Sequence, residues 1–158
     1  MKRELYMKAL IQRVSKAGVS IDGQVFSSIN RGYVVLLGVK TGDTESNALR
    51  LAQKTVALRI FPDKQQKMNL SIVDVGGEIL VVSQFTLYAD TRGGNRPSFT
   101  MAAPPEVAEK LYSVYVDSLR HILGRERVKT GKFGAMMSVE IINDGPVTIE
   151  LKSEQDEK

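Results

Sequence analysis

The strongest constraint on the fold is a change in hydrophobic period about forty residues into the chain. Up to that point the sequence is a series of short β-prone runs, and Asp22-Gly23 between two of them is a strong hairpin signal. These runs, which predict an antiparallel meander, cover residues 10–14, 18–21, 24–29 and 33–39. From Asp43 or Thr44 to Arg59, apolar residues recur at helical spacing, and the short polar residue ahead of them can cap a helix.

The same change of period recurs in the second half of the chain. Strands are predicted at residues 70–75 and, after a Gly-Gly turn, at 78–82. Because Ile79 to Val82 is a continuous apolar run, the second of these strands is expected to be buried on both faces. Pro104-Pro105 and Gly124 mark the start and the end of a second helix.

Two final strands, at residues 136–142 and 147–151, flank a Gly-Pro step. The whole pattern predicts a single α+β domain over residues 1–158, built from a mostly antiparallel, barrel-like sheet with two packed helices. The polar residues 153–158 are expected to be frayed, and Met7 is a second candidate for the first residue, which makes residues 1–6 a possible extension. Removal of residues 1–6 is then expected to leave activity unchanged.

Composition narrows the range of functions. No run approaches the roughly twenty apolar residues that span a bilayer, and the first residues lack the apolar core of a signal peptide, so a cytoplasmic protein without membrane contact is expected. There is no Cys and only one His, which excludes Cys-His pairs and multi-histidine zinc sites. We therefore expect no metal and no cofactor. His121, near the end of the second helix, is expected to be exposed, so a hydrolase built from this chain would rely on hydroxyls, amides, carboxylates, backbone dipoles or the substrate itself.

The net charge of +4 permits a polyanionic partner without requiring one. Positive side chains gather in the loop from Arg92 to Arg96 and in a second cluster formed by Arg125, Arg127, Lys129 and Lys132. A solvated surface and contact with nucleic-acid phosphates are both open readings of these two clusters.

Two short segments carry the candidate chemistry. In Ser83-Gln84-Phe85-Thr86-Leu87, directly after the buried run, side chains two apart on a strand share a face, so Gln84 and Thr86 are expected to point together. An amide and a hydroxyl can bind a carbonyl or an amino group, but neither is a good base at neutral pH; by themselves they could equally bond a neighbouring loop. The second segment, Asn143-Asp144-Gly145-Pro146-Val147-Thr148, would by default be a turn with a trans proline.

Taken together, these segments resemble the D-aminoacyl-tRNA deacylases, which hydrolyse the ester between a D-amino acid and the 3′ end of a tRNA. The resemblance runs along nearly the whole chain and includes Lys8 to Val14, Leu58 to Phe61, Lys67 to Ser71, Val73 to Leu80, Tyr88 to Arg92, Arg96 to Phe99, Ala103 to Glu106 and Thr130 to Ala135. Val147 after the proline favours the D-specific branch over related deacylases that carry Tyr there. Met136 stands where many members have an acidic residue.

The resemblance implies the family's fold and an enzyme that acts on the 3′ end of aminoacyl-tRNA. It implies a homodimer with active sites at the interface, in which Gly145-Pro146 is a cis-proline motif that reaches into the partner's pocket. Catalytic roles would fall to Gln84, Phe85 and Thr86, in a segment that forms the pocket floor. Supporting roles would fall to Ser83, Arg13, Phe133, Gly134, Ala135 and Met137, and phosphate contacts to Arg92, Arg96, Lys129 and Lys132.

The expected chemistry is rejection of L-residues by steric exclusion, which leaves glycine acceptable and makes glycyl-tRNA(Ala) a second expected substrate. Without an imidazole or a thiol in the pocket, the terminal 2′-OH of the tRNA is the favoured participant, and Thr86 as nucleophile is the alternative. A non-enzymatic nucleic-acid-binding protein and a scaffold dimer are the rival classes.

Overall fold

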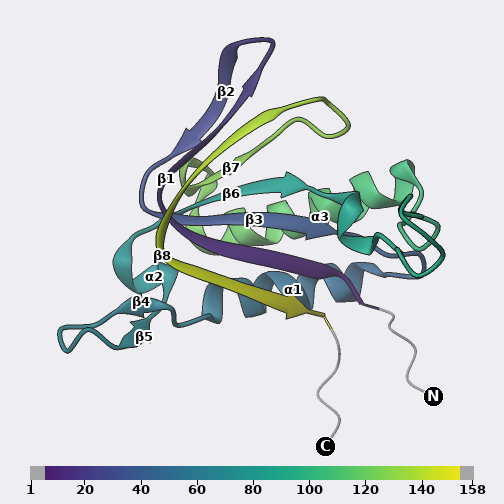
Figure 1. Cartoon of the computed structure of the whole chain (residues 1–158). Helices are drawn as coiled ribbons and strands as arrows, with labels where there is room; N and C mark the ends of the chain where they lie inside the picture. The colour runs from purple at the N-terminus through teal and green to yellow at the C-terminus, as the bar shows by residue number, and fades with distance from the viewer. Residues whose placement is uncertain (1–5, 154–158) are drawn as a thin grey trace, which may run out of the picture.

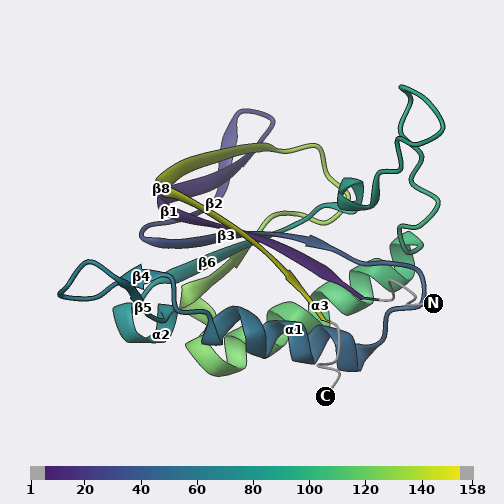
Figure 2. The same ribbon diagram turned by 60° about the horizontal axis from the view of Figure 1, so that its bottom comes forward.

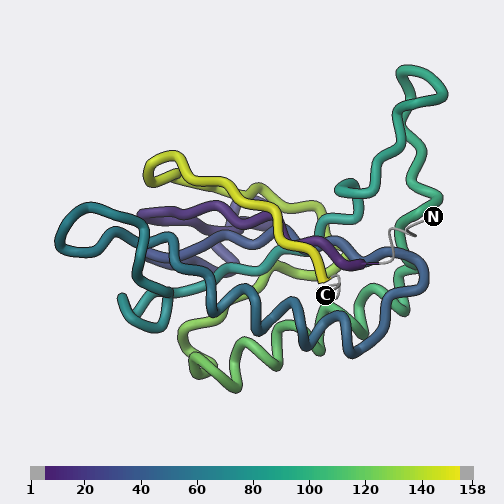
Figure 3. Tube along the Cα trace, turned by 90° about the horizontal axis from the view of Figure 1, so that it is seen from below, coloured from purple at the N-terminus to yellow at the C-terminus, as the bar shows by residue number. Residues whose placement is uncertain are grey.

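The computed structural model describes residues 6–153, and these residues form one domain of two layers. A six-stranded sheet lies on one side, and the helices α1 (Glu45–Ala57) and α3 (Pro105–Leu123) lie side by side beneath it (Figures 1 and 3). A third helix, α2 (Ile72–Val75), is a single turn. Within the described residues no helix is long and apolar enough to cross a membrane.

The sheet is organised around its first strand. β1 (Lys8–Ile21) pairs antiparallel with β2 (Gln24–Ile29), β3 (Gly32–Gly38) and β8 (Ser138–Lys152), so β3 neighbours β1 and not β2. The expected meander is therefore wrong in its pairing. One long strand also replaces the two runs predicted at residues 10–14 and 18–21, because β1 changes partner along its length without losing its extended backbone.

The sheet is mixed, whereas a mostly antiparallel one was expected. β6 (Glu78–Ser83) runs parallel to β3 and to the short β7 (Val128–Thr130), giving the order β2-β1-β3-β6-β7. The sheet curls until β2 approaches β7, where the Ser27 hydroxyl donates to the Thr130 carbonyl at 2.7 Å. The barrel-like architecture is thus confirmed, with a nearly closed sheet.

Strand β6 has both faces buried, as its apolar run predicts. Ile79 and Val81 belong to the main core between the sheet and the helices, while Leu80 and Val82 belong to a second core inside the curl of the sheet. All four are at most 3% exposed. Close packing of β3 on β6 also requires glycine at position 32, since a Cβ there would lie 1.7 Å from the Glu78 carbonyl oxygen.

The helix signals were read correctly at α1 and α3 and missed at α2. Thr44 caps α1, and α3 begins at Pro105 and ends before Gly124. The strand predicted at residues 70–75 is wrong: β5 (Met68–Leu70), paired with β4 (Phe61–Pro62), ends there and α2 follows. Ser71 and Asp74 form a capping box that starts this turn, a signal present in the sequence.

The C-terminal strands also differ from expectation. The two predicted runs are one strand, β8, which continues through the Gly-Pro step. Ser153, expected to be frayed, is fully buried: its amide donates to the Met7 carbonyl at 3.1 Å and its hydroxyl accepts from the Met7 amide at 2.9 Å. Residues 1–5 and 154–158, the rest of the two expected terminal segments, lie outside the described residues.

One buried carboxyl gives the fold a pH dependence. Asp43 is 8% exposed, and its Oδ2 accepts from the Lys40 amide at 2.6 Å. Burial raises the pKa of Asp43 to about 6. Between about pH 4 and 6 the folded chain therefore binds a proton that the unfolded chain releases, and stability falls as the pH rises through this window.

Denaturant unfolding of wild type and Asp43→Asn at several pH values should reveal the effect of this proton on stability. We expect the free energy of unfolding of wild type, relative to the variant, to decrease by about 2 kcal/mol from about pH 4 to pH 7. Asp63→Asn is the control of opposite sign, because backbone N–H donors lower the pKa of Asp63. A wild-type to Asp43→Asn difference that does not change with pH would contradict the assignment.

Candidate active site

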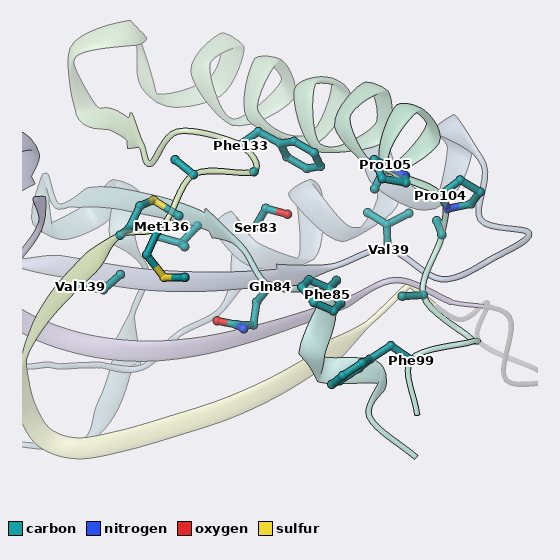
Figure 4. A pocket seen from close by; sticks show the side chains of 17 residues that line it. Val39, Ser83, Gln84, Phe85, Phe99, Pro104, Pro105, Phe133, Met136 and Val139 are labelled. Carbon is teal, nitrogen blue, oxygen red and sulfur yellow. The ribbon is translucent and has the colours of Figure 1, made fainter. Parts of the chain in front are cut away.

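A cavity of about 760 Å³ opens at the C-terminal end of β6. Strand β6 and the turn after it form one side, the segment that leads into β8 forms another, and the start of α3 closes the far end (Figure 4). Its lining is mainly apolar and comprises Val39, Val82, Ser83, Gln84, Phe85, Phe99, Ala102, Ala103, Pro104, Pro105, Ala108, Phe133, Gly134, Ala135, Met136, Met137 and Val139. None of these side chains carries a charge.

The segment Ser83 to Thr86 bends sharply at the cavity. β6 ends at Ser83, and a 3₁₀ turn, η1 (Phe85–Tyr88), begins two residues later. The backbone N–H of Gln84 donates to the Leu37 carbonyl at 2.8 Å, and this bond holds the start of the turn against β3. Gln84 and Thr86 do meet, through a hydrogen bond from Nε2 to Oγ1, but the 3₁₀ turn brings them together and not the strand geometry that was expected.

Ser83, Gln84 and Phe85 line the cavity, and Thr86 does not. Thr86 is exposed, and its hydroxyl accepts from the side-chain amide of Gln84, which is not a base. His121 is also exposed and lies on α3 away from the cavity lining. Among the described residues, the cavity therefore holds hydroxyl, amide and backbone groups but no side chain that could take a proton at neutral pH.

The opposite wall comes from the segment that leads into β8. Phe133 packs against Tyr112 of α3 with ring centroids 5.8 Å apart, and it faces Ser83 across the cavity (Figure 4). Gly134 has φ +76°, the left-handed conformation that suits glycine at this turn. Met136, at 92% exposed, adds a thioether to the rim at the position where many relatives were expected to be acidic.

Gly145 and Pro146 lie outside this cavity. Their peptide bond is cis, and both residues are exposed. In the β1–β8 ladder Gln12 pairs with Thr148 and Val14 with Asn143, so residues 144–147 of β8 bulge out opposite the single residue Arg13.

Arg13 braces this bulge. It is only 9% exposed; Nε donates to the Asp144 carbonyl at 3.0 Å and Nη1 to the Ile60 carbonyl at 2.6 Å. A 3.4 Å ion pair with the Asp144 carboxylate adds to these bonds. The structure thus brings Arg13 and the Gly-Pro step together, and separates both from the cavity of the same chain.

The basic residues divide into two kinds. Arg92 forms an ion pair with Asp90 at 2.8 Å, which lowers the pKa of Asp90 to about 2. Arg127 donates to the carbonyl of Ile72, the first residue of α2, and to that of Gly77, which follows the helix. Arg127 is therefore a structural residue. Arg92, Arg96, Arg125 and Lys132 are exposed, and Lys129 is half-buried.

Several residues that line the cavity are not among those predicted from the sequence. Phe99, which packs edge-on against Phe85 at 5.1 Å, lies on the loop that projects between η1 and α3 (Figure 2). The cavity is closed beyond it by Ala102, Ala103, Pro104, Pro105 and Ala108. The sequence pattern at Pro104-Pro105 predicts only the start of a helix. No local pattern indicated that these residues, which follow β6 only after a long loop, would return to its end.

The chain is similar to known proteins over nearly its whole length. The family model described as D-Tyr-tRNA(Tyr) deacylase matches residues 10–152. A protein of Roseiflexus castenholzii named D-aminoacyl-tRNA deacylase is 55% identical over 147 residues, which cover 93% of this chain and 92% of that protein. A protein of the same name from Marinobacter nauticus is 50% identical over 149 residues, 94% of this chain and 96% of its own length.

Two solved structures are also similar. The first, described as c-Myc DNA Unwinding Element Binding Protein, has a TM-score of 0.89 and 45% identity over 94% of this chain and 99% of that chain. The second, described as a probable eukaryotic D-amino acid tRNA deacylase, has a TM-score of 0.81 at 16% identity, over 93% of this chain and 99% of its own. At that identity the second likeness concerns the fold alone.

Proposed function

The chain belongs to the D-Tyr-tRNA(Tyr) deacylase family, and we propose that it hydrolyses D-aminoacyl-tRNA in the cavity at the end of β6 with help from the tRNA itself. Its relatives are named D-aminoacyl-tRNA deacylase, a name that describes hydrolysis of the D-aminoacyl ester. The finer proposals concern how L-residues are rejected, which group assists the attack on the ester, and how the tRNA is held.

The observation that carries the mechanism is the absence of an acid–base side chain from the described lining of the cavity. The polar groups on offer are the Ser83 hydroxyl, the Gln84 amide and the backbone. The first N–H groups of a helical turn have no partner inside the turn, and in η1 these belong to Phe85 and Thr86. Such donors suit the oxygen of an ester as negative charge develops on it.

A cavity that lacks a base leaves the proton of the attacking water to another group. The terminal 2′-OH of the tRNA lies next to the 3′ ester in any aminoacyl-tRNA, so it is positioned at no cost to the protein. We propose that this hydroxyl assists the attack. Thr86 as nucleophile is the alternative, and its exposure and its amide partner count against it.

We propose that the Gly145-Pro146 bulge is the feature that discriminates D-residues from L-residues. Because it is exposed and lies outside its own chain's cavity, it can act only on the cavity of a second copy, and we propose a homodimer with two such composite sites. Rigid carbonyls placed beside the α-carbon would clash with an L side chain and leave room for the hydrogen of a D-residue. Glycine would pass the same filter, so glycyl-tRNA(Ala) is a proposed second substrate.

The tRNA backbone is proposed to contact Arg96, Lys129 and Lys132. Arg92 can contribute only in competition with its Asp90 partner. Lys132→Ala should weaken tRNA binding. It should also reduce the slope of the logarithm of the binding constant against the logarithm of the salt concentration by about the contribution of one phosphate contact. An unchanged salt dependence would remove Lys132 from the contact surface.

The decisive experiment compares D-tyrosyl-tRNA, L-tyrosyl-tRNA and glycyl-tRNA(Ala) as substrates of the purified protein. We expect release of D-tyrosine far above the spontaneous rate, measurable release of glycine, and L-tyrosine release no faster than without protein. Binding to duplex DNA is measured on the same sample, because one similar structure is described as a DNA-binding protein. DNA binding without ester hydrolysis would support the nucleic-acid-binding class instead.

A further inference from the structure

Tyr6, two residues ahead of β1, contacts the far end of the turn that follows β6. The Tyr88 hydroxyl donates to the backbone carbonyl of Tyr6 at 2.7 Å and lies 3.3 Å from the Gly38 carbonyl. The Tyr6 ring is itself held, since the Lys152 ammonium lies 5.2 Å from its centroid. Tyr6 thus belongs to the packed structure, although the sequence placed it in an extension that could be removed without loss of activity.

Several further contacts hold Tyr88 in place. It is 6% exposed, and the Lys8 ammonium lies 5.1 Å from its ring centroid. The ring packs against Gly38, where a Cβ would come within 2.9 Å of Tyr88 Cε2. Burial raises the pKa of Tyr88, so its hydroxyl stays protonated and remains a donor, and a buried donor requires an acceptor.

This contact bears on the candidate active site because Tyr88 is the last residue of η1. At the start of the turn, Gln84 is held to the Leu37 carbonyl at 2.8 Å. At its end, Tyr88 is held to Tyr6 and Gly38. Phe85 and Thr86, the residues whose amides are proposed to face the ester, lie between these two attachments.

We propose that Tyr6 is a positioning residue, whose backbone carbonyl anchors Tyr88 and thereby fixes the turn that presents Phe85 and Thr86 to the substrate. The inference rests on the proposed function for its effect on catalysis, but the anchoring itself does not. It assigns a role to a residue that precedes the stretch matched by the family model, which begins at residue 10.

The test compares two shortened chains that differ by one residue. In the first, residues 1–5 are replaced by a single Met, so the Tyr6 carbonyl is kept; the second begins at Met7 and lacks it. We expect the first to match the full chain and the second to lose about three- to tenfold in kcat with KM within about twofold, because one hydrogen bond that orients the turn is gone. Tyr6→Gly in the first chain keeps the carbonyl without the ring and should recover at least half of the lost rate.

Tyr88→Phe closes the comparison. It removes the hydroxyl and keeps the ring, and it should lower kcat at least as much as loss of Tyr6. Added to the chain that begins at Met7, it should cost no more than about twofold further, because both changes break the same bond. Additive losses, or equal kcat values for the two shortened chains, would overturn the inference.

Backbone amide exchange of residues 84–89, measured without substrate, separates this inference from the proposed function. Faster exchange is expected in the chain that begins at Met7 and in Tyr88→Phe, but not in the chain that keeps Tyr6. If the full chain hydrolyses no D-aminoacyl-tRNA, the proposed function is wrong. The exchange rates still show whether the Tyr6 carbonyl anchors Tyr88. If the full chain is active and exchange is the same in all variants, the anchoring fails alone.

Discussion

A D-aminoacyl-tRNA whose terminal adenosine lacks the 2′-OH, with the amino acid on the 3′ oxygen, is expected to bind normally and to be hydrolysed about a hundredfold more slowly, or worse. A positioned proton-transfer group contributes about 10²- to 10⁴-fold, and the described cavity lining offers no side chain for that role. Single-turnover rates with excess protein, together with the dissociation constant of each tRNA, separate slow chemistry from weak binding.

Thr86→Ala gives the opposite test of the same question. If the 2′-OH assists the attack, this variant retains substantial activity, because only the hydrogen bond with Gln84 is lost. Thr100→Ala is the matched control, an exposed threonine that does not line the cavity. Normal turnover of the 2′-deoxy substrate, with abolition of activity in Thr86→Ala and a trapped acyl-enzyme in wild type, would establish Thr86 as the nucleophile instead.

Gly145→Ala is expected to lower the rate on D-aminoacyl-tRNA by about a hundredfold or to reduce the preference for D over L by a similar factor. Gly145 has φ +131°, which disfavours any side chain, and an added Cβ would lie 2.9 Å from Val147 Cγ2 and 3.2 Å from Arg13 Nη2. The methyl group would therefore displace the bulge from its Arg13 brace, and an ångström of misplacement is enough for an effect of this size.

Gly94→Ala is the control for backbone conformation alone. Gly94 has φ +147°, but an added Cβ would meet no atom within 4 Å. Its activity and its D/L preference should be close to those of wild type. Equal defects in both glycine variants would mean that general strain, and not the position of the bulge, causes the loss.

If Gly145→Ala lowers the rate on D-aminoacyl-tRNA, mixing it with a second variant of low activity tests whether the bulge serves the partner's cavity. Ala135→Phe, which projects a ring into the cavity, is combined in equal amounts with Gly145→Ala after unfolding and refolding. Random pairing makes about half of the dimers mixed, each with one site whose cavity and bulge are both intact, so about a quarter of wild-type activity should return. No recovery, although native mass spectrometry shows mixed dimers, would place the functional bulge and cavity in the same chain.

The local parts of the fold were readable from the sequence because they depend on neighbours along the chain. The apolar stripe and the flanking Pro and Gly set the bounds of α3, and the uninterrupted run Ile79 to Val82 marked a strand buried on both faces. Where a local signal was misread, as at residues 70–75, the correct one was present in the capping box of Ser71 and Asp74.

Which strands pair with one another could not be predicted from the sequence. Hydrophobic period specifies which face of a strand is buried but not which strand lies beside it, so the central place of β1 and the parallel pairing of β6 with β3 and β7 could not be derived. The same holds for the site: Gln84 and Thr86 could be singled out as chemical groups, yet the 3₁₀ turn that joins them forms on the end of β3.

By itself, then, the sequence determined the type of domain, its two long helices, its buried strand and the residue types available for chemistry, since all of these follow from composition and short-range pattern. Only the tertiary structure decided that Phe99 to Ala108 close the cavity, that Gly145-Pro146 lies outside it beside Arg13, and that Tyr6 meets Tyr88. These contacts join residues that are distant in the chain, and they exist because packing the curled sheet against α1 and α3 fixes where each strand ends.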